Sequence, residues 1–255
     1  MIQENLEQTV SQRTEELKIA LRAEKEHNEL KTKFLTLVSH EFKTPLSGIL
    51  TSTMLLSKYK LTKEQEKRDK HIETITILVN SLNNILNDFL SVDKIETGNI
   101  QYTSRTFKLS KLVKDVVYNA GVLLKEGQEI NYPKNIDEVS LYLDENILEL
   151  ILSNLVNNAV KYSSENATID IDITQNNKEI IFSITDNGIG IPKKDQKHIF
   201  NRYYRAENVK STQGTGIGLN IVKNHLDYLG GSISFKSEEN VGSTFTVSIP
   251  NINQK

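Results

Sequence analysis

The stretch Asn154-Leu-Val-Asn-Asn-Ala-Val-Lys-Tyr162 combines an apolar and a polar pattern, both with the period of an α-helix. Its apolar residues continue the spacing of the residues before it, which predicts a helix that buries one face in a core. Asn154, Asn158 and Lys161 are spaced four and three residues apart, so they share another face. Two amide oxygens and a cation that project together suit phosphates and a hard cation such as Mg²⁺. A solvated amphipathic helix would show the same pattern, so this stretch alone leaves both interpretations open.

Two glycine-containing segments follow in the chain. Asp186-Asn-Gly-Ile-Gly-Ile-Pro192 comes directly after a stretch typical of a β-strand. Its carboxylate can accept the exocyclic amine of a base such as adenine, and its isoleucines can cover a flat ring. Gly214-Thr-Gly-Ile-Gly-Leu219 runs into a predicted helix, whose first amides and positive dipole end can meet an anion. Either loop alone is compatible with an ordinary turn, but with Asn154–Tyr162 in this order they predict one nucleotide site.

The polar segment between the two glycine loops, residues 193–213, has the character of a lid. It contains Phe200-Asn-Arg-Tyr-Tyr-Arg205 and Lys210. A cation on a lid can stabilise the terminal phosphate of a nucleotide, and Arg205 is our candidate for that role.

The residues around these segments predict one α+β domain, residues 105–251. Strands are expected where apolar and polar residues alternate, and helices where they repeat every three to four residues. Asp144 is expected to cap the helix that leads to Asn158. The result is a two-layer sandwich that carries the nucleotide-binding segments, a mostly antiparallel sheet with helices on one face. The predicted helices span residues 109–125, 144–159 and 216–229, and the predicted strands span 168–174, 179–185, 232–235 and 243–249.

Residues 1–98 are predicted to be all-helical. Residues 1–33 carry a thin apolar stripe with a phase break, which favours a coiled-coil linker over a solvated single helix. Residues 34–98 carry wider apolar faces and form an antiparallel helical hairpin, whose second helix is expected from about Thr62, where a capping box begins. Because each face is too wide for one partner helix, we expect the hairpin to dimerise into a four-helix bundle.

Ser39-His-Glu-Phe-Lys-Thr-Pro45, on the first long helix, places a nucleophile beside a base. A neutral imidazole at His40 can attack a γ-phosphoryl group while Glu41 takes the second ring proton. Thr44 lies one helical turn from His40 and could position a water molecule. Pro45 frees the Glu41 carbonyl and is expected to bend the helix. The other four histidines have no comparable surroundings, so we interpret them as ordinary surface or core residues.

Composition excludes several classes of protein and site. The 255 residues carry a net charge of −2, which does not favour nucleic acid or an anionic membrane as a partner. The absence of cysteine excludes disulfides and zinc–thiolate sites. No stretch approaches the roughly 18 apolar residues of a membrane span, and the N-terminus does not resemble a signal peptide. We therefore expect a cytoplasmic location, and we interpret the chain as a piece of a longer protein whose neighbours could include a membrane anchor.

Together, the five segments resemble the transmitter core of bacterial sensor histidine kinases over about residues 30–250. Ser39–Pro45 is similar to the H box, and the other four to the N, G1, F and G2 boxes of the Bergerat-type ATP-binding fold. The resemblance implies that His40 is the phosphoacceptor, Glu41 the general base and Thr44 a phosphatase residue, with Asn158 as a ligand of Mg²⁺. The residues it implies around ATP are Asn154, Asn158, Lys161, Tyr162, Asp186, Gly188, Gly190, Ile191, Tyr204, Arg205, Gly214, Thr215, Gly216, Gly218, Leu219 and Thr244.

The resemblance also implies partners, and it leaves alternatives. It implies a homodimer, a response-regulator receiver domain that takes the phosphoryl group, and an upstream sensor domain that this chain lacks. Asn201 and Lys43 depart from the residues frequent in the family without touching the chemistry. An ATPase of the same superfamily without phosphohistidine is the main alternative. An anti-sigma-type serine kinase and a non-catalytic scaffold are two others. The superfamily ATPases and the serine kinase lack the upstream hairpin, and a scaffold would not need an intact ATP site.

Overall fold

A computed structural model describes residues 2–96, 101–209, 212 and 214–251, and the chain divides into two compact units. The first unit ends at Ile85 and is entirely helical, and the second begins at Leu86 and contains all the strands of the described residues. No helix of the described residues is both long and apolar enough to cross a membrane.

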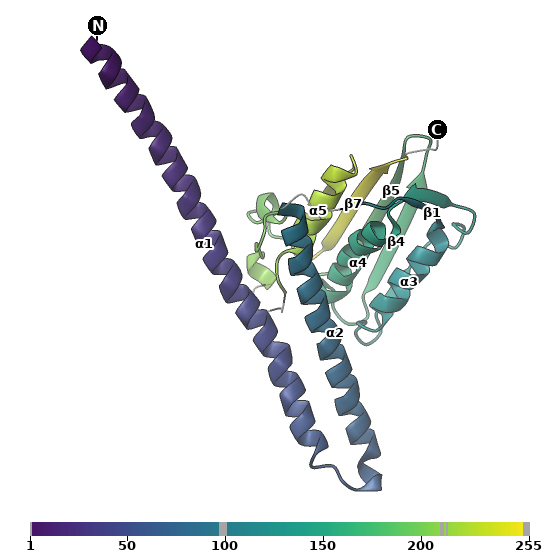
Figure 1. Ribbon diagram of the computed structural model, residues 1–255. Helices are drawn as coiled ribbons and strands as arrows, with labels where there is room; N and C mark the ends of the chain where they lie inside the picture. The colour runs from purple at the N-terminus through teal and green to yellow at the C-terminus, as the bar shows by residue number, and fades with distance from the viewer. Residues whose placement is uncertain (1, 97–100, 210–211, 213, 252–255) are drawn as a thin grey trace. The chain divides into compact units, whose positions relative to one another are not determined.

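The helical unit is built from two long helices (Figure 1). Helix α1 spans Ile2–Leu56 and continues through Pro45, so it runs across the predicted boundary between linker and hairpin without a break. Helix α2 spans Gln65–Glu96 and follows a short 3₁₀ turn, η1, at Thr62–Glu64. The second helix therefore begins slightly later than the capping-box pattern suggests.

Within the hairpin, α1 and α2 approach closely at Gly48. A Cβ atom at this position would lie 2.6 Å from Leu78 Cδ1, so the missing side chain is what lets the helices meet there. Many apolar side chains of this unit remain exposed, as is typical of helices that need a further partner. They include Val10, Leu17, Leu21, Leu35, Leu46, Leu50, Met54, Ile72, Ile77 and Val79.

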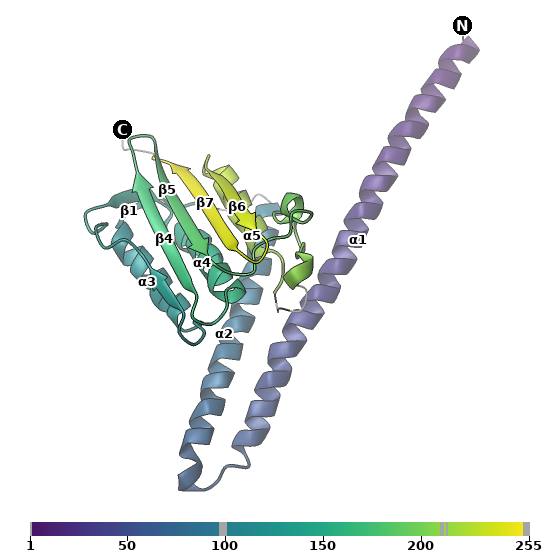
Figure 2. The same cartoon turned by 180° about the vertical axis from the view of Figure 1, so that it is seen from behind.

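The second unit confirms the predicted α+β sandwich. Its main sheet has five strands in the order β2-β4-β5-β7-β6, all pairs antiparallel except β2 with β4. A separate two-stranded sheet pairs β1 with β3. Figure 2 shows the open face of the main sheet, with α3, α4 and α5 behind it. The elements are β1 Arg105–Lys108, α3 Leu109–Gly121, β2 Glu129–Asn131, β3 Ser140–Leu143, α4 Glu145–Tyr162, β4 Thr168–Gln175, β5 Glu179–Asp186, η2 Gln196–His198, η3 Glu207–Val209, α5 Gly218–Tyr228, β6 Ser232–Glu238 and β7 Gly242–Pro250.

The core lies between the helices and the inner face of the main sheet. Alternate residues of β5 such as Phe182 and Ile184 are fully buried against the apolar face of α4, which includes Ile151 and Leu155. Asp144 caps α4 as predicted, because its side chain accepts hydrogen bonds from the backbone amides of residues 146 and 147 at 3.0 and 3.2 Å. Burial of this one face of α4 leaves its polar face directed away from the core.

Candidate functional site

The polar face of α4 meets the second glycine loop. A Cβ atom at Gly218 would lie 2.4 Å from Asn154 Oδ1, and one at Gly214 would lie 2.5 Å from Lys161 Nζ. A larger residue at either point would displace the end of the Lys161 or Asn154 side chain, so the loop lies directly on the residues that we expected to face phosphates. Asn158 lies between them on the same helical face. The structure therefore brings together two segments that the sequence could only predict to be neighbours.

The end of α4 also holds the first glycine loop. The backbone amide of Ile189 donates to the Tyr162 carbonyl at 3.1 Å, and a Cβ at Gly188 would lie 2.5 Å from the same oxygen. Lys161 Nζ lies 4.8 Å from the centre of the Tyr162 ring, within cation–π range. Both glycine loops thus converge on the last turn of one helix.

Asp186 ends β5 at the edge of this site. Its Oδ1 accepts a hydrogen bond from the Gly188 amide at 2.9 Å, which shapes the turn. Burial raises the pKa of this carboxyl group, while hydrogen bonds from the backbone amides of Gly188 and Ser243 lower it. Because each carboxylate oxygen can accept more than one hydrogen bond, the group can also receive an amine from a ligand.

Two neighbours of Asp186 have structural reasons for their identity. Gly190 has φ +60°, and a Cβ there would lie 2.0 Å from the Glu238 carbonyl oxygen, so another residue would be strained and crowded. Ile191 donates its amide to Ser237 Oγ at 2.9 Å and packs its side chain against the core. Ile191 therefore packs against the core in the structure, and its role as a cover for a flat ring stays a prediction.

The strand register gives the position of Thr244 in the sheet. On β7, Thr244 pairs with Thr185, and the two hydroxyl oxygens are 3.0 Å apart on the open face of the sheet. Asp186 pairs instead with Ser243, which is buried on the inner face. Ser243 is therefore the β7 residue on the side of Asp186. The alternation along β7 shows that Ser243 and Thr244 face opposite sides of the sheet. Only the pairing register shows which of the two lies on the side of Asp186.

The lid segment is held by its own hydrogen bonds. Tyr204 donates its hydroxyl to Asp195 Oδ1 at 2.6 Å, and this bond raises the pKa of the phenol. Arg205 Nη2 donates to the Val209 carbonyl at 2.6 Å, and its Cγ would lie 3.1 Å from a Cβ at Gly216. Arg205 therefore lies beside the glycine loop, with its guanidinium hydrogen-bonded within the lid segment.

Other predicted residues of this region fall in three groups. Leu219, on α5, packs its side chain against the core. Thr215 Oγ1 accepts the Ile217 amide and donates to Asp88 Oδ2, both at 3.3 Å. Lys210 lies outside the described residues. Asp88 was not anticipated from the sequence, where it is one polar residue on the predicted second helix.

The nucleophile segment lies in the helical unit. The His40 side chain is 76% exposed, and its Nδ1 lies 3.8 Å from Oε1 of Glu41, whose side chain is only 3% exposed. That distance exceeds a hydrogen bond, so a small rotation is needed before the carboxylate can take the ring proton. Thr44 Oγ1 donates to the His40 carbonyl at 3.3 Å, along the helix. His40, Glu41 and Thr44 thus lie on one stretch of α1, and the imidazole of His40 is accessible.

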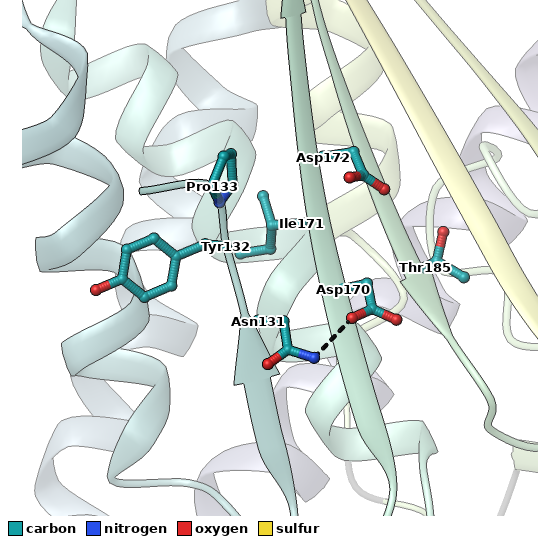
Figure 3. Close-up of a pocket in the computed structure, with 7 residues that line it drawn as sticks. All are labelled: Asn131, Tyr132, Pro133, Asp170, Ile171, Asp172 and Thr185. Atoms are coloured by element: carbon teal, nitrogen blue, oxygen red, sulfur yellow. Dashed lines mark hydrogen bonds between the residues drawn. The ribbon is translucent and has the colours of Figure 1, made fainter. Parts of the chain in front are cut away.

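A separate cavity of about 420 Å³ opens on the other face of the sheet (Figure 3). The amide of Asn131 donates to Asp170 Oδ1 at 2.9 Å at its edge. None of the residues that line this cavity belongs to the predicted ATP site, so it is a different surface of the domain. The lining residues are Asn131, Tyr132, Pro133, Asp170, Ile171, Asp172 and Thr185.

Two family models match the chain. One, described as the His Kinase A (phospho-acceptor) domain, matches residues 30–98. The other, described as the histidine kinase-, DNA gyrase B- and HSP90-like ATPase, matches residues 143–253. The first contains His40 and the second contains both glycine loops.

Individual proteins agree with these matches. Signal transduction histidine-protein kinase BarA of Escherichia coli strain K12 is 36% identical over 258 residues, which cover 96% of this chain but 27% of BarA. The crystal structure of full-length ShkA in complex with AMPPNP has a TM-score of 0.57 and 26% identity, covering 85% of this chain and 45% of that one. Histidine kinase AdeS of Acinetobacter baumannii has a TM-score of 0.59 at 20% identity, covering 84% of this chain and 98% of that one, which supports the fold.

Proposed function

Because the chain belongs to the sensor histidine kinases and joins their phospho-acceptor domain to their ATP-binding domain, we propose that it uses ATP to phosphorylate His40. The single observation that carries this proposal is an exposed His40 with Glu41 beside it, in the same chain as a helix face fitted against a glycine loop. The chain spans 27% of the length of BarA, so what we say of the activity and partners of a whole protein is proposed.

The chemistry at His40 follows from its orientation. With its proton on Nδ1, toward Glu41, the imidazole attacks the γ-phosphorus of ATP through Nε2. The new N–P bond forms as the bond from phosphorus to the bridging oxygen breaks, and ADP leaves. Glu41 accepts the Nδ1 proton, which prevents the phosphorylated ring from carrying a full positive charge. A carboxylate 3.8 Å away can reach this proton by a change of rotamer.

The ATP-binding unit supplies the nucleotide contacts. We infer that Asp186 receives the adenine amine, and that Lys161 and the amides of Gly214–Leu219 bind phosphates. A Cβ at Gly214 or Gly218 would fill the space against Lys161 and Asn154, which fits a cradle for a close ligand. Mg²⁺ suits the amide oxygens of this face, with Asn158 as its ligand, and when bound it would neutralise phosphate charge.

The remaining steps of the proposal concern partners. Phosphohistidine is a good phosphoryl donor, so we infer transfer to an aspartate of a response-regulator receiver domain. We infer that Thr44, one turn from His40, positions the water molecule that later removes this phosphate by hydrolysis. The exposed apolar side chains of the helices support a homodimer, and an upstream sensor domain would deliver the signal through residues 1–33.

The decisive experiment is incubation of the purified chain with Mg²⁺ and γ-labelled ATP. We expect label that is stable to base and lost in acid, as phosphohistidine is. His40→Gln should abolish it while leaving ATP binding intact, and His71→Gln, in the same unit, should label normally. ATP hydrolysis without protein labelling would favour the alternative of a superfamily ATPase, and label retained in His40→Gln would refute the assignment of His40.

A second experiment asks whether transfer occurs within or between subunits. Asn158→Ala is expected to weaken Mg·ATP binding about tenfold or more, because it removes a metal ligand. Mixed dimers of His40→Gln and Asn158→Ala subunits then contain one competent ATP site and one competent histidine on different chains. Label on the Asn158→Ala subunit would show transfer between subunits, and its absence would show transfer within one.

A further inference from the structure

The end of α2 supports the glycine loop of the ATP site. The second unit begins at Leu86 and so includes this end of the helix. Phe89 packs against Ile217 and Ile221, which are fully buried. One residue earlier, Asp88 Oδ2 accepts a hydrogen bond from Thr215 Oγ1 at 3.3 Å. Thr215 in turn accepts the Ile217 amide at 3.3 Å, so a single chain of contacts links α2 to the loop backbone.

Asp88 is an acidic residue beside the glycine loop, where we expect the phosphates of ATP to bind. Burial raises its pKa to about 6, although the Thr215 hydrogen bond and the positive charge of Lys161 lower it. The carboxylate is therefore mostly ionised at neutral pH. Lys161 and the loop that it faces are the same groups to which we assign the phosphates of ATP.

We propose that Asp88 is an internal anion that competes with nucleotide phosphates for the glycine loop and Lys161. This inference rests on the proposed ATP site and adds a regulator to it. Ionised Asp88 and a nucleotide phosphate near the same cation repel one another, so each weakens the binding of the other there. Phosphate binding and the Asp88–Thr215 contact therefore oppose one another, which couples nucleotide occupancy to the end of α2.

Binding measurements with adenosine, ADP and ATP separate this competition from a purely structural contact. Asp88→Asn keeps the shape and can still accept from Thr215, but it has no charge. We expect it to bind ADP and ATP about five- to tenfold more tightly than the wild type, while adenosine, which has no phosphate, changes less than about twofold. Asp115→Asn, an exposed residue of α3, removes the same charge elsewhere and should bind all three ligands as the wild type does.

The outcomes are distinct. Unchanged or weaker ADP and ATP binding in Asp88→Asn would overturn the competition, and so would an equal gain for adenosine. If the wild type binds none of the three ligands, the proposed ATP site is wrong, and this inference falls with it. Binding of all three by the wild type, with no effect of the substitution, overturns this inference alone.

The pH dependence of the wild type tests the same idea without relying on the variant's folding. Asp88 is ionised above about pH 6 and neutral below it, so competition should weaken as pH falls through that value. The groups that act on it are Thr215 from the loop and Lys161 from α4. The ratio of Asp88→Asn to wild-type ADP affinity cancels titration of the ligand, and it should approach one near pH 5. A ratio that stays constant from pH 8 to pH 5 contradicts the proposal.

Discussion

The helical unit and the ATP-binding unit place their apolar side chains differently. In the ATP-binding unit, the apolar residues of β5 and α4 are enclosed between the sheet and the helices. In the helical unit, Pro45 and Ile85 are the only buried apolar side chains among the residues whose side chains are described, and Leu50 is 58% exposed. One unit has its own core, whereas the other has apolar faces that require a partner.

The two units also present their functional groups differently. The His40 ring stands out from α1, where a second molecule can reach it. Asp186 is partly buried and oriented by two backbone amides, so it is preorganised for one bound ligand. A phosphoacceptor that must meet both a nucleotide and a partner protein benefits from access, and a nucleotide site benefits from a fixed geometry.

The largest effect is expected when one apolar side chain in each unit is replaced by alanine. Phe182→Ala, in the core of the ATP-binding unit, should reduce its free energy of unfolding by about 3–5 kcal/mol. Leu50→Ala should barely change the unfolding of that unit, but should weaken dimerisation about tenfold or more, because an interface Leu contributes roughly 1.5–3 kcal/mol. Denaturant unfolding and sedimentation would measure the two effects. Equal losses of stability without any change in dimerisation would show that the helical unit has a core of its own.

A smaller effect is expected from Thr44→Ala. Because Thr44 is placed to position water rather than to touch ATP, the substitution should reduce phosphatase activity on a phosphorylated receiver domain about tenfold or more. Autophosphorylation of His40 should stay within about twofold. Thr44→Ser keeps the hydroxyl and should restore much of the phosphatase activity. Equal loss of both activities in Thr44→Ala would indicate that the side chain serves the helix, through its bond to the His40 carbonyl.

The smallest expected effect concerns pH and the ATP-binding unit. His225 is buried, its Nδ1 lies 2.9 Å from the Tyr102 hydroxyl, and burial lowers its pKa. The folded state therefore keeps this imidazole neutral while the unfolded chain takes up a proton below about pH 6.5. Stability from this group is present above that pH and is lost as pH falls through it.

Thermal unfolding from pH 8 to pH 5 would measure this dependence. The raised pKa of Asp88 acts in the opposite direction, since the folded state binds that proton first. The useful quantity is therefore the difference between His225→Gln and the wild type. The wild type should lose its stability advantage over the variant as pH falls, and a constant difference would mean that His225 does not titrate on unfolding.

Local patterns predicted much of the fold. The helices around His40 and Asn158, the cap at Asp144 and the long strands β4 and β5 follow from periodicity and capping, which act over a few residues. The short strands β1, β2 and β3 were not predicted, because three or four residues are too few for a period to appear. The parallel pairing of β2 with β4 likewise depends on where distant segments pack.

The chain's amino acids by themselves determined which residues can serve ATP and phosphohistidine chemistry, because spacing along one helix or one turn decides which side chains share a face. Only the tertiary structure decided which of those residues meet. It placed Lys161 against Gly214, put Ser243 rather than Thr244 on the side of Asp186, and brought Asp88 to Thr215. These contacts join segments far apart in the chain, and strand register and core packing, which no local pattern specifies, set them.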